Sequence, residues 1–582
     1  MQKEEKIFHG IVASPGIVIG KAYLYTKKNP RVEEKKVVAE EIPKELERLH
    51  HAIERSEKEL QKIMLFAEQK IGETKIFEAQ ILILQDTVLL DSITKRISKE
   101  CKNAEYIVYE EFGKYQQLLF NAQDEYMRER ANDIEDIKNR IIRNIQQEKL
   151  ISRFEENSIV IAQSLTPADT ILFSRNNVLG YVTEMGGTTS HASLLSRSLQ
   201  LPSIVGVKNI TEHIETGDDI IVDGLNGNVI LNPTEKTKKK SQKKYDSYIT
   251  FENELGSLRE LYPTTLDGKT VTLSSNIEST QEIDFTFSQG SQGVGLFRSE
   301  RLLLERSSFP TEEEQYQVYK EIAHRMFPQR VVLRTFDIGG DKNVFQTQTQ
   351  LEENPFLGWR GIRLLLDKPE ILLSQLQAML RASEKGNATI LFPMVSGLQE
   401  VQKIKSYLKE AKKNLQEKNI PFDNKISIGI MIEVPSAAML IDTLAQEVDY
   451  ISIGTNDLIQ YLLAVDRGNE RVSSLYQEFH PAVIQTIHTI ITTTHRHKKK
   501  VGMCGDMASN PLATTLLLGL GLDEFSVIPA LLPEIKKVIR SVDFQQAKEL
   551  AVKVLALSSE EEIKKILKKH LHTILPDMPI MD

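Results

Sequence analysis

Residues 428–457 read IGIMIEVPSAAMLIDTLAQEVDYISIGTND and contain two short apolar runs with a helical pattern between them. The runs IGIMI and YISI are rich in isoleucine, which is typical of strands buried in a sheet. Between them, apolar residues recur at helical spacing, which predicts a helix. A strand, a helix and a second strand in this order form the repeating unit of a parallel sheet.

The same unit recurs through the C-terminal half of the chain. Eight strand candidates alternate there with helical stretches over about 320 residues. This pattern predicts a (β/α)₈ barrel of the TIM type over residues 263–582, because such barrels often run to about 250 residues or more. The candidates are VTLSSN (271–276), GVGLFRSE (293–300), VVLRTFDIGG (331–340), TILFPMV (389–395), IGIMIEVP (428–435), YISIGTND (450–457), VGMCGD (501–506) and EFSVIP (524–529).

Four arginines follow strands of this barrel or lie in the loops beyond them. The C-terminal ends of barrel strands open on one mouth, so we expect these side chains to converge. Arginine binds phosphate or carboxylate through a planar fork. For any single arginine a structural ion pair is the better interpretation, whereas the set favours a small polyanionic ligand. The four are Arg298, Arg334, Arg360 and Arg467.

Two carboxylates and a thiol complete the expected mouth. Glu433 and Asp457 follow consecutive strands and offer the hard oxygen ligands that suit Mg²⁺. Either carboxylate alone would not decide between a metal ligand and a structural role. Cys504 stands in the turn-like sequence GMCG at the end of another strand. A lone cysteine is usually buried and inert, unless its neighbours indicate otherwise.

The N-terminal half has a different organisation. Strand-like runs at residues 6–25 and 159–232 flank a segment with helical spacing that is dense in Glu and Lys. We therefore expect one α/β domain, residues 1–36 and 146–232, with an inserted helical subdomain at 37–145. Residues 233–262 contain near their start the run EKTKKKSQKK (235–244), six lysines in ten residues, and are interpreted as a solvated linker helix rather than a binding patch.

A second candidate site lies in the sequence GGTTSHAS, residues 186–193, where a glycine-rich turn runs into a helix at Ser190–Leu199. A helix N-terminus binds phosphate through its free N–H groups and its positive dipole. The same field keeps His191 neutral, so that its ring nitrogen is a nucleophile, and nearby hydroxyls add donors. The alternative is a histidine that merely caps the helix. The hydroxyls belong to Thr188, Thr189 and Ser190.

Composition narrows the class of protein. The chain has 582 residues and a net charge of −8, which disfavours a general nucleic-acid binder. Its two cysteines, Cys101 and Cys504, cannot form a disulfide framework, so a reducing, cytoplasmic setting is favoured. The charged N-terminus has no apolar signal region, and no apolar stretch is long enough to span a membrane.

The chain resembles the enzyme I family of the bacterial sugar phosphotransferase system along essentially its whole length. The similarity is specific because it rests on many long segments. They are GIVASPGIVIGKAYLY (10–25), DEYMRERANDIEDI (124–137), GGTTSHASLLSRSLQLPSIVG (186–206), GVGLFRSE (293–300), RTFDIGGDK (334–342), NPFLGWRGIR (354–363), GIMIEVPSAAM (429–439), SIGTNDLIQYLLAVDRGNE (452–470) and GMCGDMASNPLATTLLLGLGLDEFS (502–526).

The resemblance implies Mg²⁺-dependent transfer of the phosphoryl group of phosphoenolpyruvate to His191 and then to the carrier protein HPr, with release of pyruvate. It implies a swivelling phosphohistidine domain, an HPr-docking helical subdomain and a barrel that forms a homodimer. By motif, Cys504 would donate a proton to the enolate of pyruvate. We expect its thiol to have a pKa near the unperturbed value of about 8.5, at which it remains a usable acid at neutral pH. The other implied roles are phosphate binding by Arg298, Arg334, Arg467 and Asn456, lining of the substrate site by Arg360, and Mg²⁺ binding by Glu433 and Asp457.

Two residues depart from the pattern of the family. Thr188 stands where members usually carry arginine, which removes a cation near the phosphohistidine. Asp506 stands where members carry glutamate, and its shorter side chain resets a hydrogen bond to Cys504 or to the substrate.

Other classes of protein compete with this interpretation. Phosphoenolpyruvate synthase and pyruvate phosphate dikinase need an ATP-binding domain, for which no segment remains. The nitrogen-regulatory paralogue of enzyme I usually has an additional N-terminal sensory domain, which this sequence does not show, so we expect the sugar pathway rather than this paralogue. A non-catalytic scaffold that binds HPr-like partners is disfavoured because the chain retains the reactive residues of both sites.

Overall fold

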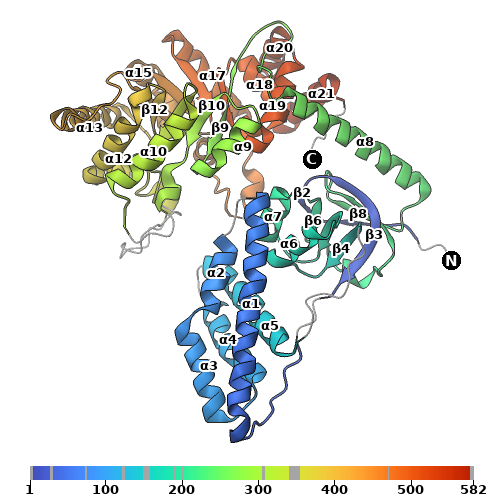
Figure 1. The fold of residues 1–582 in the computed structure, drawn as a ribbon. Coiled ribbons are helices and arrows are strands. Elements are labelled where there is room, and N and C mark those ends of the chain that lie inside the picture. Colours follow the sequence, from blue (N-terminus) through green and yellow to red (C-terminus); the bar gives the residue numbers. More distant parts are fainter. Residues whose placement is uncertain are drawn as a thin grey trace. The chain divides into compact units, whose positions relative to one another are not determined.

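The computed structural model describes residues 4–26, 30–71, 75–120, 125–147, 157–187, 191–199, 201–303, 308–339, 354–469, 471–576 and 578. The chain divides into two compact units, with the boundary between Ile249 and Thr250 (Figure 1). Each unit is described by itself. In the described part of the chain, no helix is both long and apolar enough to cross a membrane.

The N-terminal unit contains a mixed sheet of eight described strands in the order β1-β8-β7-β3-β4-β5-β6-β2. Strands β3 to β6 are parallel to their neighbours in that run, and the outer pairs are antiparallel. Alternate residues of β4 enter different cores, Ile159 and Ile161 on one face and Val160 on the other. The strands are β1 (Lys6–His9), β2 (Ile11–Ser14), β3 (Ile17–Tyr25), β4 (Ser158–Ala162), β5 (Gly180–Thr183), β6 (Ser203–Val205), β7 (Asp219–Asp223) and β8 (Asn228–Leu231).

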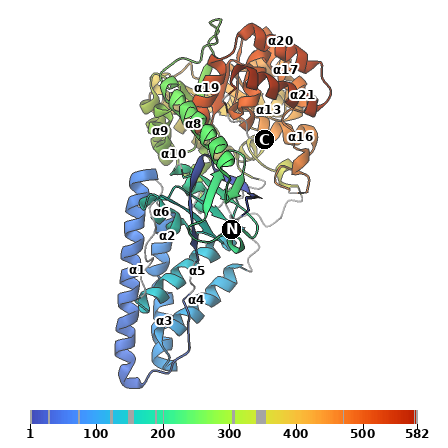
Figure 2. The ribbon, with the colours of Figure 1, turned by 90° about the vertical axis from the view of Figure 1, so that its right-hand side faces the viewer.

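A helical subdomain is inserted between β3 and β4, as the sequence predicted. In both views α1 runs alongside the other helices of this subdomain (Figure 1; Figure 2). The buried apolar side chains of the subdomain form one core, which also includes Ala168, Ile171 and Leu195 from the two helices of the α/β part. The helices of this unit are α1 (Ile42–Ile71), α2 (Lys75–Leu84), α3 (Thr87–Glu100), α4 (Ala104–Phe120), α5 (Glu125–Ile145), α6 (Pro167–Arg175) and α7 (His191–Ser198).

One continuous helix, α8 (Glu235–Leu258), contains the boundary between the two units. Its lysine-rich start is only partly a solvated face, because Lys238 and Lys244 form ion pairs of 3.1 and 2.6 Å with Asp219 and Asp223. Its last turns are anchored differently, since Phe251 and other apolar residues of α8 pack in a small core with the end of the chain.

The C-terminal unit is a closed barrel of eight described parallel strands, which confirms the predicted (β/α)₈ fold. All eight strand candidates form strands. They are β9 (Thr272–Ile277), β10 (Gly293–Phe297), β11 (Arg330–Arg334), β12 (Ala388–Phe392), β13 (Ser427–Ile432), β14 (Tyr450–Ile453), β15 (Lys500–Met503) and β16 (Glu524–Val527). The described helices are α9 (Ile283–Ser288), α10 (Glu312–Met326), α11 (Ile362–Asp367), α12 (Pro369–Ala382), α13 (Leu398–Glu417), α14 (Pro435–Met439), α15 (Ile441–Glu447), α16 (Thr455–Leu463), α17 (Pro481–Arg496), α18 (Pro511–Leu520), α19 (Leu532–Arg540), α20 (Phe544–Leu555) and α21 (Glu560–Ile574).

The N-terminal end of the barrel is filled by a buried polar cluster. Tyr450, Glu524 and Arg330 are the first residues of their strands. The Tyr450 hydroxyl donates to Glu524 at 3.2 Å, Glu524 forms an ion pair with Arg330, and the Arg330 guanidinium lies 4.3 Å from the centre of the Tyr450 ring. Gly502 leaves room for this ring, because a Cβ at that position would lie 2.0 Å from the tyrosine oxygen. The barrel is therefore closed at this end and open at the other.

We predict that Gly502→Ala destabilises the barrel, because the added methyl group overlaps the Tyr450 hydroxyl. Overpacking of this kind lowers the free energy of unfolding by about 1–3 kcal/mol. Urea unfolding of the full chain, followed by the fluorescence of its single tryptophan, Trp359, measures the change within the barrel unit.

Gly256→Ala is the matched control, since a Cβ at this position of α8 meets no atom within 4 Å. This variant should unfold at the same urea concentration or a higher one. Its free energy of unfolding should be unchanged or raised by up to about 1 kcal/mol. Equal urea midpoints for Gly502→Ala and the unsubstituted protein would contradict the prediction, because the cluster would then accommodate the added methyl group.

Candidate active site

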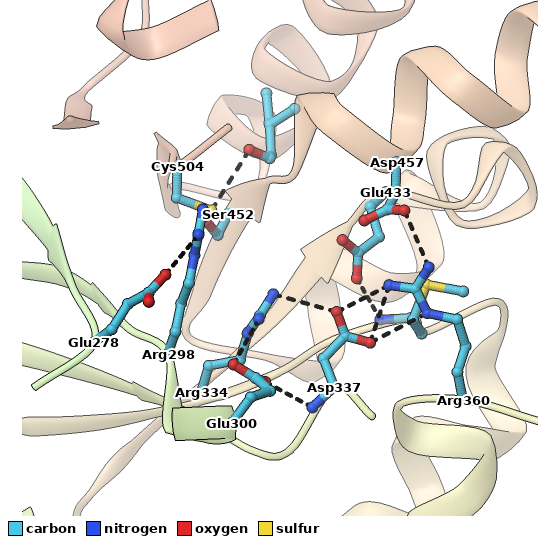
Figure 3. Close-up of polar contacts among 12 residues, drawn as sticks. Glu278, Arg298, Glu300, Arg334, Asp337, Arg360, Glu433, Ser452, Asp457 and Cys504 are labelled. Carbon is cyan, nitrogen blue, oxygen red and sulfur yellow. Dashed lines mark hydrogen bonds and ion pairs between the residues drawn. The ribbon is translucent and has the colours of Figure 1, made fainter. Parts of the chain in front are cut away.

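A cavity of about 230 Å³ lies at the C-terminal ends of the barrel strands. It brings together side chains from β10 and β11 and from the segments after β13, β14 and β15 (Figure 3). The convergence follows from the parallel strands, each of which delivers its last residues to the same mouth. The described lining residues are Leu296, Arg298, Arg334, Asp337, Met431, Glu433, Gly454, Asn456, Asp457, Arg467, Cys504, Gly505 and Asp506.

Three of the four arginines singled out in the sequence line this cavity, in different environments. Arg334 is buried and pairs with Glu300 at 3.0 Å and Asp337 at 3.5 Å (Figure 3). Arg298 is half-exposed and pairs with Glu278 at 2.9 Å, and Arg467 is exposed. The cavity therefore has one firmly held guanidinium and two whose positions a ligand can adjust.

Arg360 lies directly behind the cavity wall, and its implied role in lining the substrate site stays a prediction. Among the described residues, those that line the cavity do not include it. It is buried and bonds two that do, Asp337 at 2.9 Å and Asp457 at 3.1 Å. The Tyr461 hydroxyl lies 3.3 Å from the same guanidinium nitrogen that bonds Asp457. In this structure Arg360 orients two carboxylates of the cavity wall.

The carboxylates of the cavity fit a divalent cation. Glu433 is 1% exposed and accepts a hydrogen bond of 2.5 Å from the Met394 N–H. Burial, followed by the charges of Asp457 and Asp337, raises the pKa of Glu433, because several anionic groups share one desolvated site. A cation beside Glu433 and Asp457 would relieve this repulsion, and both groups are the oxygen ligands that Mg²⁺ prefers.

Mg²⁺ commonly uses one or two protein carboxylates and takes its remaining ligands from substrate and water. Within the described ranges, no group of three or more His, Cys, Asp and Glu side chains is arranged to hold a metal. The pair Glu433 and Asp457 is consistent with this mode of binding.

Asn456 and Asp506 form a reciprocal pair at the cavity. The Asn456 amide donates to the Asp506 carboxylate at 2.9 Å, and the Asp506 backbone N–H donates to the Asn456 side-chain oxygen at 2.8 Å. Asp506 is thus paired with Asn456 rather than with Cys504. Aspartate in place of the family's glutamate at position 506 therefore affects the position of the Asn456 amide, which we expect to contact phosphate.

The Cys504 thiol faces the cavity from the first position after β15. It is 3% exposed and accepts a hydrogen bond of 3.3 Å from the Ser452 hydroxyl (Figure 3). Burial raises its pKa to about 11, so the expectation of a pKa near the ordinary value is wrong. The thiol is therefore protonated at neutral pH, as a proton donor must be.

Several residues of the site escaped the sequence analysis. Asp337 and Glu300 hold Arg334, and Ser452 holds Cys504. Asp337 had a usable signal, since it follows Arg334 by three residues in the loop after the same strand. Ser452 had none, because an inward-facing serine within a strand has no distinctive pattern.

The second candidate site lies in the other unit. The structure describes His191 by its backbone, as the first residue of α7, whereas Thr188, Thr189 and Ser190 lie outside the described residues. The free N–H groups of a first helical turn are thus at His191. The start of α7 is held by the Tyr181 hydroxyl, which donates to the Ala192 carbonyl at 3.0 Å, and by the Ser193 hydroxyl, which donates to Gly187 at 2.8 Å.

Comparison with known proteins matches three parts of the chain to domains of one class, the PEP-utilising enzymes. Residues 9–130 match the N-terminal domain of PEP-utilising enzymes, residues 154–227 match their mobile domain, and residues 252–544 match their PEP-binding domain.

Three relatives match over nearly their whole length, and each is described as a phosphoenolpyruvate-protein phosphotransferase. The relative from Buchnera aphidicola subsp. Schizaphis graminum is 41% identical over 97% of this chain and 99% of its own. That from Staphylococcus carnosus is 40% identical over 97% and 99%, and that from Haemophilus influenzae is 41% identical over 97% and 98%. The chain therefore belongs to the phosphoenolpyruvate-protein phosphotransferase family, the enzyme I family of PEP-utilising enzymes.

Proposed function

We propose that this chain transfers the phosphoryl group of phosphoenolpyruvate to His191 and then to HPr, releasing pyruvate as the first step of sugar uptake. The observation that supports this most strongly is the cavity at the barrel mouth, which combines guanidinium groups, carboxylates and a protonated thiol. The guanidinium groups suit the phosphate and carboxylate of the substrate, the cavity carboxylates suit a cation that bridges to it, and the thiol suits the methylene carbon that must gain a proton.

The arginines bind the anionic end of the substrate. Arg298, Arg334 and Arg467 all line the cavity, and their guanidinium groups suit phosphate oxygens. Because Glu300 and Asp337 fix Arg334, this group is already oriented before the substrate arrives. Asn456 adds an amide, oriented by Asp506.

Glu433 and Asp457 would hold Mg²⁺, which when bound neutralises charge on the phosphoryl oxygens. Arg360 supports this arrangement because its bond of 3.1 Å to Asp457 fixes that carboxylate. Arg360 is thus a positioning residue in this proposal.

Proton transfer completes the reaction. Loss of the phosphoryl group leaves the enolate of pyruvate, whose methylene carbon takes a proton from the Cys504 thiol. A pKa of about 11 keeps this proton on sulfur until the basic enolate forms. His191 is the phosphoryl acceptor, so the N-terminal unit has to bring α7 to the barrel mouth during turnover.

HPr is the proposed second acceptor, and the helical subdomain is its proposed docking site. Large apolar side chains are exposed there, with Leu82 at 68% and Val88 at 72%. A homodimer through the barrel, implied by the resemblance, belongs to the same proposal.

We predict that His191→Ala takes up no acid-labile label from ³²P-phosphoenolpyruvate with Mg²⁺, because the acceptor nitrogen is gone. The variant should still bind phosphoenolpyruvate, as shown by a thermal shift of the barrel. His213→Ala, a change of an exposed histidine in the same unit, is the control and should be labelled normally. Label at the wild-type level in His191→Ala would refute the assignment.

We predict that Glu433→Gln and Asp457→Asn each raise the Mg²⁺ concentration needed for half-maximal activity by about tenfold or more, because one anionic ligand is lost. Turnover at saturating Mg²⁺ should also fall. Asp442→Asn alters an exposed carboxylate of α15 and should have no effect. Full activity of the unsubstituted protein after chelation would rule out the metal site.

We predict that Cys504→Ala slows steady pyruvate formation by about 10²–10⁴-fold, the usual effect of removing a positioned acid. A single transfer of phosphate to His191, measured by rapid quench, should slow less. Cys101→Ala removes the other thiol of the chain and should leave both rates unchanged. If Cys504→Ala forms pyruvate at the parent rate, the proton comes from another group.

A further inference from the structure

Ser452 provides the hydroxyl that contacts the Cys504 thiol. β14 and β15 are paired in register, with Ser452 opposite Gly502, so the serine side chain lies next to the segment that ends at Cys504. Its Oγ donates to Cys504 Sγ at 3.3 Å, and both residues are buried, Ser452 with 1% of its surface exposed (Figure 3).

The backbone of Cys504 is held on both sides by hydrogen bonds. The Cys504 N–H donates to Ile453 at 3.1 Å, and the Asn276 amide donates to the Cys504 carbonyl at 3.0 Å. Ser526 in turn donates to Asn276 at 2.6 Å. Only the side-chain torsion and the direction of the S–H bond therefore remain to be set.

The surroundings of the Cys504 thiol affect how easily it loses its proton. Cys504 packs in a buried cluster with Leu296, Met431 and Tyr450 among other residues. A thiolate formed against such apolar groups is poorly solvated, which disfavours proton loss. Among the ionisable groups that act on it, Arg334 and Arg298 favour the thiolate and Glu433 opposes it.

The hydrogen bond from Ser452 acts on both states of the sulfur. In the thiol it occupies a sulfur lone pair, so that the S–H bond points elsewhere. The thiol also has the Ile453 carbonyl as an acceptor, but this oxygen is a long 3.8 Å from the sulfur, which leaves the substrate in the cavity as the better target. In the thiolate the same hydroxyl donates to the negative sulfur.

We propose that Ser452 is the positioning residue for proton donation by Cys504, directing the thiol proton to the substrate and stabilising the sulfur left behind. This inference rests on the proposed function. In the step, the S–H bond breaks, a C–H bond forms at the methylene carbon of the enolate, and the negative charge moves from the enolate to sulfur. Solvent then returns a proton to the thiolate through the open cavity.

The first test compares two isosteric variants, Ser452→Thr and Ser452→Val, together with Ser452→Ala. Loss of the hydroxyl in the Ala and Val variants should slow steady pyruvate formation by about tenfold to a hundredfold, as expected for a hydrogen bond to a charged group. A single transfer of phosphate to His191 should change by less than about threefold, because protonation follows it. The Thr variant keeps the donor and should recover most of the rate.

The second test measures the thiol directly in a Cys101→Ser background, where Cys504 is the one remaining cysteine. Iodoacetamide reacts with the thiolate. At a fixed pH of about 9, which lies below the pKa of this thiol, the alkylation rate is therefore proportional to the small fraction of thiolate. Without the Ser452 hydroxyl, alkylation should slow by about tenfold, equivalent to about one unit of pKa. The S–H stretching band of Cys504 in Raman spectra should also shift.

Ser275→Ala is the matched control, because it removes another buried barrel hydroxyl, one that donates to Ser291 at 3.0 Å. It should leave both rates unchanged. Wild-type pyruvate formation and alkylation in folded Ser452→Val would overturn the inference. Failure of the proposed function would look different, because the unsubstituted protein itself would then release no pyruvate from phosphoenolpyruvate.

Discussion

The arrangement of the barrel mouth depends on the buried carboxylate of Asp337. This group is 1% exposed and lies between two guanidinium groups, at 3.5 Å from Arg334 and 2.9 Å from Arg360. Removing one partner from such a buried set leaves an uncompensated charge, which costs about 3–5 kcal/mol. Through Arg334 the carboxylate orients a guanidinium group that lines the cavity, and through Arg360 it orients Asp457. Under the proposed function, this shared network couples substrate binding to metal binding.

The barrel makes this network possible because its strands deliver residues that are far apart in the sequence to one place. Arg298 and Asp506 are separated by more than two hundred positions, and both line the same cavity. The opposite end is closed by the cluster around Tyr450 and Glu524. The mouth is consequently the end at which a ligand can reach the Cys504 thiol, and the apolar layer below that thiol raises its pKa.

Sequence reasoning predicted the barrel and the residues at its mouth, because both follow from local patterns. Runs such as YISI mark buried strands, and polar side chains directly after them are carried to the mouth by the parallel topology. It did not predict the elevated thiol pKa or the place of Arg360, because both depend on burial and on partners from other loops. Ser452 was missed for the same reason, since a serine inside a strand gives no sign of what it faces.

In the proposed reaction, cleavage of phosphoenolpyruvate in the barrel cavity places its phosphoryl group on His191. The most direct measurement is peptide mapping by mass spectrometry at alkaline pH after incubation with phosphoenolpyruvate and Mg²⁺, combined with an assay of the pyruvate released. We expect phosphate on the peptide that contains His191, in amounts equal to the pyruvate formed. Phosphate on a different residue, or pyruvate released without phosphorylated protein, would contradict it.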